Sequence, residues 1–96
     1  MTTVETYIPT AHGSRYLQQL CKHWSHRLDV SFTPSKAYVP FDAESVCLLN
    51  ADDGGLGVRI DAPDMSAAAK LSDVVFRHVE RFAFRESLER PIWRRA

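Results

Sequence analysis

Three side chains that could bind a metal ion or take part in catalysis lie close together in the segment LCKHWSH, from Leu20 to His26. Cys21 could act as a nucleophile or as a metal ligand, and His23 and His26 could act as ligands or proton carriers. A zinc site needs such groups in a tetrahedral arrangement around one point. The chemistry therefore depends on the element that holds these residues and on the faces to which it turns them.

The segment from about Ala11 to Ser25 has the apolar spacing of a helix, and Thr10 or Ser14 could cap its N-terminus. The apolar stripe consists of Tyr16, Leu17, Leu20, Cys21 and Trp24. On such a helix Cys21 and His23 are two positions apart and project in nearly opposite directions. We therefore expect the thiol to face the core and the imidazoles to face solvent, which argues against a shared metal ion and against a cysteine nucleophile.

A polar edge follows the other side of the same helix. Three interpretations of this edge stay open, namely a solvated or partner-facing surface, a contact for an anion or cofactor, and a metal site. The edge comprises His12, Arg15, Gln19, Lys22, His23 and His26.

A second helix is expected to begin at Pro63 and Asp64 and to end near Phe84. Arg77, Arg81 and Arg85 recur every four residues and line one edge of it, where guanidinium groups could hold phosphate or carboxylate. The alternative is pairing with acidic neighbours, which are Asp73, Glu80, Glu86 and Glu89. The apolar stripe of this helix is Ala68, Leu71, Val74, Val75, His78, Val79 and Phe82, in which His78 is interpreted as a satisfied histidine at the core edge.

The remaining segments predict antiparallel strands. Alternation of apolar and polar residues predicts strands at Val4–Ile8 and Leu28–Phe32, and Pro40 places the candidate strand Ala37–Phe41 at a sheet edge or beside a bulge. Two further strands flank a turn at Asn50 to Gly55, where Gly54 and Gly55 are expected to adopt positive φ.

These elements predict one α+β domain over residues 1–96, with residues 87–96 as a C-terminal tail that lies along the domain through Ile92 and Trp93. We expect an antiparallel sheet of four to five strands with two helices packed on one face, in the order β-α-β-β-β-β-α.

The segment Val46 to Leu49 is apolar throughout, so its inward face is ambiguous. If Val46 and Leu48 point to the core, then Cys47 and Leu49, together with Tyr38, form an apolar patch on the open sheet face. Such a patch is typical of a partner surface, and a second copy of the chain is the simplest partner.

Charge and hydropathy exclude several classes of protein. The 12 basic and 12 acidic side chains cancel, so no overall field attracts nucleic acid or an anionic membrane. No segment approaches the roughly 20 apolar residues of a membrane span, and the N-terminus lacks the pattern of a signal peptide. We expect a cytoplasmic domain that binds neither nucleic acid nor membrane and keeps Cys21 and Cys47 reduced.

Two segments carry a family resemblance: SRYLQQLCKHWSHR, from Ser14 to Arg27, and HVERFAFRE, from His78 to Glu86. They resemble the signatures of a bacterial family known as domain of unknown function number 2218. The resemblance implies a fold like that of the TATA-binding-protein-like group, and relatives fused to siderophore-interacting flavin reductases imply a connection with iron uptake. The segment Ser31 to Phe41 is less typical of the family. The matching residues are Arg15, Tyr16, Leu17, Cys21, Lys22, His23 and His26 in the first segment, and Arg81, Phe82, Phe84, Arg85 and Glu86 in the second.

The sequence thus predicts a noncatalytic binding or accessory module without a cofactor. The edge from His12 to His26 and the column from Arg77 to Arg85 would hold an anionic ligand or a protein partner in iron or siderophore metabolism. One alternative is a metal- or haem-dependent enzyme in which His23 and His26 bind iron. The other is a structural homodimer that supports a flavin-type siderophore reductase.

Overall fold

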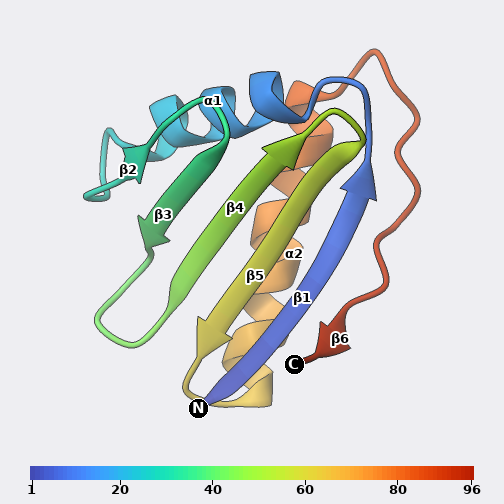
Figure 1. Cartoon of the computed structure of the whole chain (residues 1–96). Helices are drawn as coiled ribbons and strands as arrows, with labels where there is room; N and C mark the ends of the chain where they lie inside the picture. Colours follow the sequence, from blue (N-terminus) through green and yellow to red (C-terminus); the bar gives the residue numbers. More distant parts are fainter.

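The computed structural model describes residues 1–96 and consists of two layers, an antiparallel sheet and two helices that cover one of its faces (Figure 1). Across the sheet the strand order is β2-β3-β4-β5-β1-β6. The expected fold class is confirmed, with six strands where four to five were predicted. The elements in chain order are β1 (Thr2–Pro9), α1 (Gly13–Trp24), β2 (Ser31–Phe32), β3 (Lys36–Pro40), β4 (Val46–Asp52), β5 (Gly55–Ala62), α2 (Met65–Phe82) and β6 (Arg94–Arg95).

The longest strand pairing in the sheet joins β1 and β5, which are aligned from Thr2 opposite Ala62 to Pro9 opposite Gly55. Alternate residues of both strands are buried against the helices, and they join the inward stripes of α1 and α2 in one core of 18 residues. The expected inward stripe of the first helix is confirmed, since all five of its members are buried. Neither helix is both long enough and apolar enough to cross a bilayer.

The side chains of β4 that face the core are not those that the expected apolar patch required. Cys47 is completely buried and Leu49 is 1% exposed, whereas Leu48 is only partly covered. The cause is register, because Cys47 lies opposite Ile60 and Leu49 opposite Val58, which both face the core. The expectation that Cys47 and Leu49 lie on the open face is therefore wrong.

The turn between β4 and β5 is held by a carboxylate and not by positive φ. No glycine in the chain has positive φ, so the expectation for Gly54 and Gly55 is wrong. Instead, Asp52 Oδ1 accepts hydrogen bonds from the backbone N–H groups of both glycines, each at 2.9 Å, and from the Tyr7 hydroxyl at 2.6 Å. Gly55 is required by space, because a Cβ there would overlap the carbonyl oxygen of Ile8.

The helix starts differ in detail from the expectation. His12 occupies the N-cap of α1 without a side-chain hydrogen bond, so neither Thr10 nor Ser14 caps this helix. At α2 the N-cap is Asp64, whose carboxylate accepts from the Ala67 N–H at 2.8 Å. Pro63 therefore lies one residue before the cap and not at the first helical position.

The sheet ends in two short edge strands. β2 is shorter than expected because Leu28 belongs to the turn that ends α1. Its N–H donates to the Trp24 carbonyl at 2.8 Å. Strand β6 belongs to the tail and pairs with β1. The tail is fixed through the backbone of Ile92, whose carbonyl accepts from the Thr6 hydroxyl at 2.8 Å. Its side chain is 82% exposed, so only Trp93 packs as expected.

We predict that Gly55→Ala lowers the free energy of unfolding by about 1–3 kcal/mol, because the new methyl group meets backbone atoms of β1 that cannot move aside. Gly57→Ala is the matched control on the same strand. Its Cβ would lie at least 3.5 Å from its nearest neighbours, so its effect should stay within about 0.5 kcal/mol. Urea unfolding monitored by circular dichroism measures both, and equal effects would contradict the steric explanation.

Candidate functional site

Helix α1 turns its thiol inward and its imidazoles outward, as expected. Cys21 is fully buried, while His23 and His26 are exposed. Burial raises the pKa of the Cys21 thiol to about 11 and raises the pKa of Cys47 as well, so neither is a thiolate at neutral pH. The chain contains no group of three or more histidine, cysteine, aspartate or glutamate side chains placed to hold one metal ion.

Two histidines from different helices meet where α1 packs against α2. The ring centroids of His23 and His78 are 5.3 Å apart, and that of Phe82 lies 6.1 Å from His23. His78 Nδ1 is 2.6 Å from the Val74 carbonyl oxygen. A carbonyl can only accept, so Nδ1 carries the hydrogen, and Nε2 of the neutral ring has a free lone pair. His78 is thus the satisfied, half-buried histidine that was expected, with one nitrogen still available.

Two adjoining hollows share His78, and we call them together the histidine–arginine cleft. The first has a volume of about 460 Å³ and the second about 470 Å³. The first is lined by His23, Trp24, His26, Arg27, Leu28 and His78, and the second by Val74, Arg77, His78 and Arg81. No carboxylate lines either hollow. The cleft therefore combines cationic and apolar groups without internal neutralisation.

The arginines of the cleft have no acidic partners. The two ion pairs in the protein are Arg59 with Asp61 at 3.4 Å and Arg90 with Asp73 at 3.9 Å. Arg77 donates from Nε to the backbone carbonyl of Asp73 at 3.3 Å and not to its carboxylate. The alternative in which acidic neighbours pair with the arginine column is therefore wrong.

Positive charge around His23 suppresses its protonation. Partial desolvation is the largest cause of its lowered pKa, followed by the charges of His78 and Arg81 and then those of His26 and Arg27. All four neighbouring groups are cationic or become so on protonation. Desolvation disfavours a charge of either sign, whereas these neighbouring charges would attract an anion.

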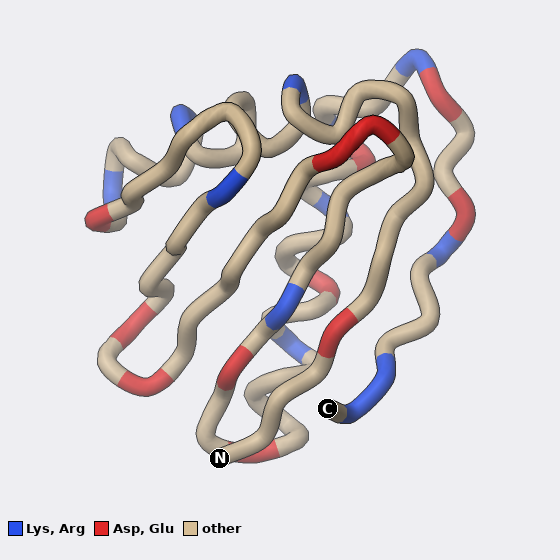
Figure 2. The backbone as a smooth tube through the Cα atoms, viewed as in Figure 1, with Lys and Arg blue, Asp and Glu red and all other residues tan.

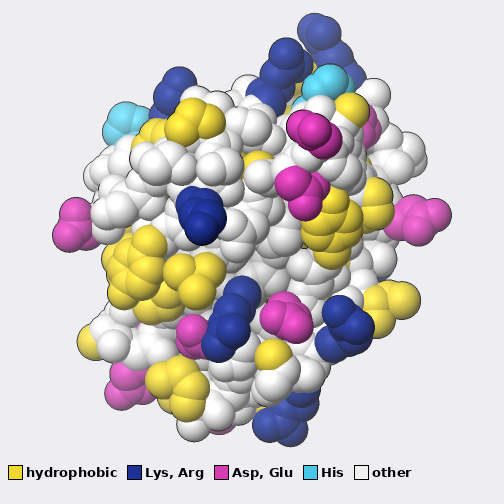
Figure 3. Space-filling view, viewed as in Figure 1, with side chains coloured by type: hydrophobic (Ala, Val, Ile, Leu, Met, Phe, Trp, Pro, Cys, Tyr) yellow, Lys and Arg dark blue, Asp and Glu magenta, His cyan; other side chains and the backbone are white.

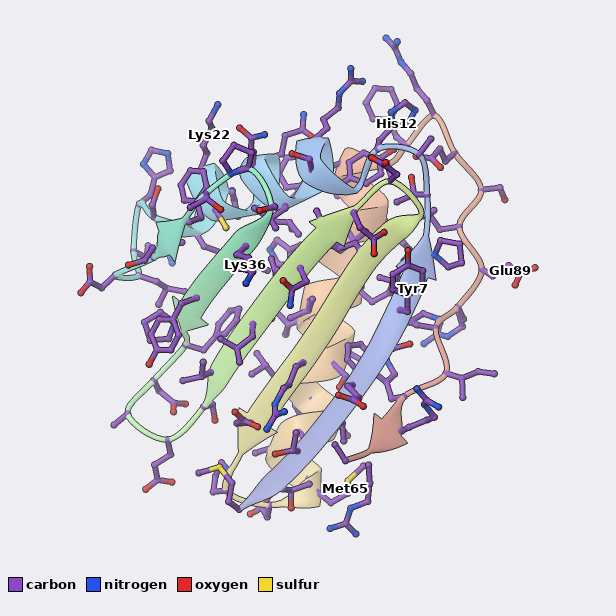
Figure 4. All side chains as sticks on the ribbon, in the orientation of Figure 1. Tyr7, His12, Lys22, Lys36, Met65 and Glu89 are labelled. Carbon is purple, nitrogen blue, oxygen red and sulfur yellow. The ribbon has the colours of Figure 1, made fainter.

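The other predicted site residues lie away from the cleft. His12 and Arg15 border a separate hollow near the acidic turn of β4 and β5, where Figure 2 shows Asp52 and Asp53 in red. Lys22 projects from the outer edge of α1, far along the helix from His12 (Figure 4). Gln19 is also exposed, and Arg85 lies 5.4 Å over the ring of Phe84, beyond the end of α2.

Of the nine residues that the sequence suggested, the structure therefore brings four together, which are His23, His26, Arg77 and Arg81. Arg27, Leu28 and His78 also line the cleft and were not among the expected site residues. The spacing of His78, three residues before Arg81 on one helix, was a signal that could have identified it.

The open sheet face carries no continuous apolar patch. Tyr38 does lie on this face, 47% exposed, and Leu48 lies opposite it on β4. The same row continues across the sheet through Arg59, Glu5 and Arg94. Figure 3 shows the hydrophobic groups of this face divided by charged side chains. The patch from which self-association was expected is thus smaller than the sequence suggested.

A carboxylate ties the segment after α2 to the start of α1. Glu86 accepts a hydrogen bond from the Tyr16 hydroxyl and further hydrogen bonds, at 2.9 and 3.0 Å, from the Thr10 hydroxyl. The hydrogen bond from Tyr16 is the largest cause of the lowered pKa of Glu86. This contact joins the two signature segments across 70 positions of sequence.

The fold and this site define a small two-layer α+β domain with a cationic cleft between its helices. The chain belongs to a family described as uncharacterized proteins conserved in bacteria, DUF2218, whose model matches residues 5–94. It is also similar to the NMR structure of PA4090 from Pseudomonas aeruginosa, with 33% identity, a TM-score of 0.83, and coverage of 98% of this chain and 96% of that chain. No curated protein matches it. The family resemblance expected from the two segments is confirmed.

We predict that Arg81→Gln raises the pKa of His23 toward its ordinary value of 6.5, because one repelling charge is removed. Arg85→Gln is the matched control and should leave that pKa unchanged, since Arg85 is not among its causes. Histidine titration by NMR measures the His23 pKa in both variants. Equal changes of this pKa would contradict the assignment of the repulsion to Arg81.

The same shift links stability to pH. Because the folded pKa of His23 lies below 6.5, the unfolded chain binds more protons between the two values, and stability falls as pH falls through this window. Arg81→Gln should weaken this dependence. Denaturant unfolding between pH 7 and pH 5, about the range in which an ordinary histidine titrates, measures the effect.

We predict that Tyr16→Phe lowers the free energy of unfolding at neutral pH by about 0.5–1.5 kcal/mol, because Glu86 loses a hydrogen-bond donor. The folded pKa of Glu86 is depressed below 4.5, so this stabilisation is present above 4.5 and is lost as pH falls through the folded pKa. The difference between variant and parent should therefore shrink in acid. Tyr38→Phe, which removes a hydroxyl from the open sheet face, is the control, and an equal loss there would contradict the assignment.

Proposed function

We propose that the histidine–arginine cleft binds an anionic ligand and that the protein is a noncatalytic binding or accessory module. The observation that carries this proposal is the lining of the cleft, which contains three arginines, three histidines and no carboxylate. The total charge of the protein is zero, with 12 basic and 12 acidic side chains. The positive cluster is therefore local, as a binding site requires, and does not reflect a basic surface in general.

Guanidinium groups suit this task because their planar N–H groups match the oxygens of phosphate or carboxylate. Each solvent-exposed contact contributes only about 0–1 kcal/mol, so several must act together. A simple inorganic anion should then bind with a dissociation constant in the millimolar range, which corresponds to about −4 kcal/mol.

Histidine protonation should add to the affinity at lower pH. Nε2 of neutral His78 is an acceptor and repels an anionic oxygen, whereas Nε2 of its imidazolium form donates a hydrogen bond. Partial desolvation and then its cationic neighbours lower the pKa of His23, and a bound anion would offset the repulsion from those neighbours. Anion binding is thus coupled to proton uptake.

The composition of the cleft supports binding without covalent chemistry. Its lining has no serine, threonine, cysteine, aspartate or glutamate, and both cysteines of the chain are buried with raised pKa values. The side chains that most often act as nucleophiles are therefore not at the site. The imidazoles and guanidinium groups that are present can hold and orient an anion.

We place the module in iron or siderophore metabolism, beside a flavin-type reductase, because its signature segments resemble those of domains fused to such enzymes. A binding module suits that setting, since it needs no flavin site of its own. Coexpression with a siderophore-interacting reductase from the same host, followed by size-exclusion chromatography, tests this part. Separate elution at micromolar concentrations would count against it.

We predict that inorganic phosphate shifts the NMR resonances of His23 and His78 and that its affinity rises as pH falls from 7.5 to 5.5, about one unit either side of an ordinary histidine pKa. The double variant Arg27→Gln/Arg81→Gln should bind about tenfold more weakly, since it removes two charges from the cleft. Arg15→Gln/Arg85→Gln is the matched control, with the same charge change outside the cleft, and should bind like the parent.

Two results would contradict the proposal. One is the absence of histidine shifts at phosphate concentrations roughly tenfold above the expected millimolar constant. The other is equal weakening by the two double variants, which would show that phosphate responds to net charge and not to the cleft.

A further inference from the structure

The first hollow of the cleft is built on a continuous series of rings. Trp24 packs edge-on against Phe41, with centroids 5.0 Å apart, and lies 5.5 Å from His78. The series continues from His78 to His23 at 5.3 Å and from His23 to Phe82 at 6.1 Å. These separations are in the range in which aromatic rings attract one another. The hollow therefore has walls that favour a further flat ring.

Apolar surface and charge lie side by side in the cleft. Trp24 and Leu28 contribute apolar surface to the first hollow, whereas the second is dominated by Arg77 and Arg81. His78 belongs to both hollows, and Arg27 lines the first hollow together with Leu28, so guanidinium groups border the apolar part. A ligand with two chemically different ends would match this division.

An inorganic ion would leave most of the cleft unused. The first hollow alone, at about 460 Å³, has the size of a pocket for a small organic molecule, roughly 300–1,000 Å³. An ion held by the arginines would not touch Leu28 or the edge of Trp24. Water would then remain against this apolar surface, which an aromatic group could displace.

We infer that the ligand is an aryl anion, with one flat aromatic ring in the first hollow against Leu28 and His78 and with a carboxylate or phosphate group directed toward Arg27 and Arg81. This inference rests on the proposed function and deepens it by naming the class of ligand. The ring stacks on imidazole and fills the apolar part of the hollow. The anionic group lies near guanidinium groups that line the cleft and that have no acidic partner.

Two pairs of probes test the inference on the unmodified protein. Phenyl phosphate is compared with methyl phosphate, and benzoate with acetate, by NMR titration at one pH and ionic strength. Each pair shares its anionic group and differs in the ring. We expect the aryl member to bind about tenfold more tightly in each pair, the scale of one aromatic stacking contact, and to shift the Trp24 indole and His78 resonances.

Variants separate the ring from the charge. Leu28→Ala should weaken phenyl phosphate far more than methyl phosphate and so remove most of the preference, whereas Arg81→Gln should weaken both probes by the same factor. Leu71→Ala is the matched control, because Leu71 packs partly against the core but does not line the cleft. It should keep the preference of the parent.

Equal affinities within each pair would overturn the inference while leaving the proposed anion site intact. A preference for the aryl probe that survives in Leu28→Ala, with shifts outside the cleft, would also overturn it. If none of the four probes binds, both the inference and the proposed function fail.

Discussion

The packing of α1 against α2 on one face of the sheet is the constraint on which the rest of the structure depends. Each helix has one apolar stripe, and both stripes share a single core with the inward residues of β1, β4 and β5. Burial of one such side chain contributes about 1.5–3 kcal/mol, more than an exposed repulsion between like charges costs. The core can therefore bring the histidines of α1 beside the arginines of α2. The cleft keeps unpaired positive charges because the free energy of hydrophobic packing exceeds the cost of the repulsion between them.

Periodicity in the sequence predicted the orientation of α1 correctly and that of α2 only in part, because Ser72 and Phe76 are buried in α2 while Leu71, Val74, His78 and Phe82 are half-buried. The spacing of Leu17, Cys21 and Trp24 defined the buried face of α1, and His23 and His26 faced solvent as expected. Periodicity could not predict which residues of α1 meet which residues of α2. That depends on where the helices cross. The cleft therefore contains only some residues of the expected edge of α1, and it includes His78 but not His12.

The errors in the sheet have a similar origin. The apolar run at Val46 to Leu49 contains two alternating sets of hydrophobic residues, and only pairing with β5 determines which set is buried. The glycine pair suggested positive φ, but Gly55 serves the close approach of β1 to the turn. The Asp52 carboxylate supplies the hydrogen bonds of that turn. The burial of β4 thus depends on its register with β5, and the need for Gly55 depends on β1, which is distant in sequence.

The course of the last segment has a consequence for how the domain can be joined to other polypeptides. The tail leaves the end of α2, runs back along β1 and ends beside the first strand, where the Ala96 N–H donates to the Thr3 carbonyl at 3.0 Å. Figure 1 shows both termini at the end of the molecule opposite α1. Neighbouring, surface-located termini tolerate attachment of further domains. A polypeptide fused at either terminus would begin at the end of the molecule opposite α1, the helix that contributes His23 and Trp24 to the cleft. Its point of attachment would therefore be separate from the place where a ligand binds.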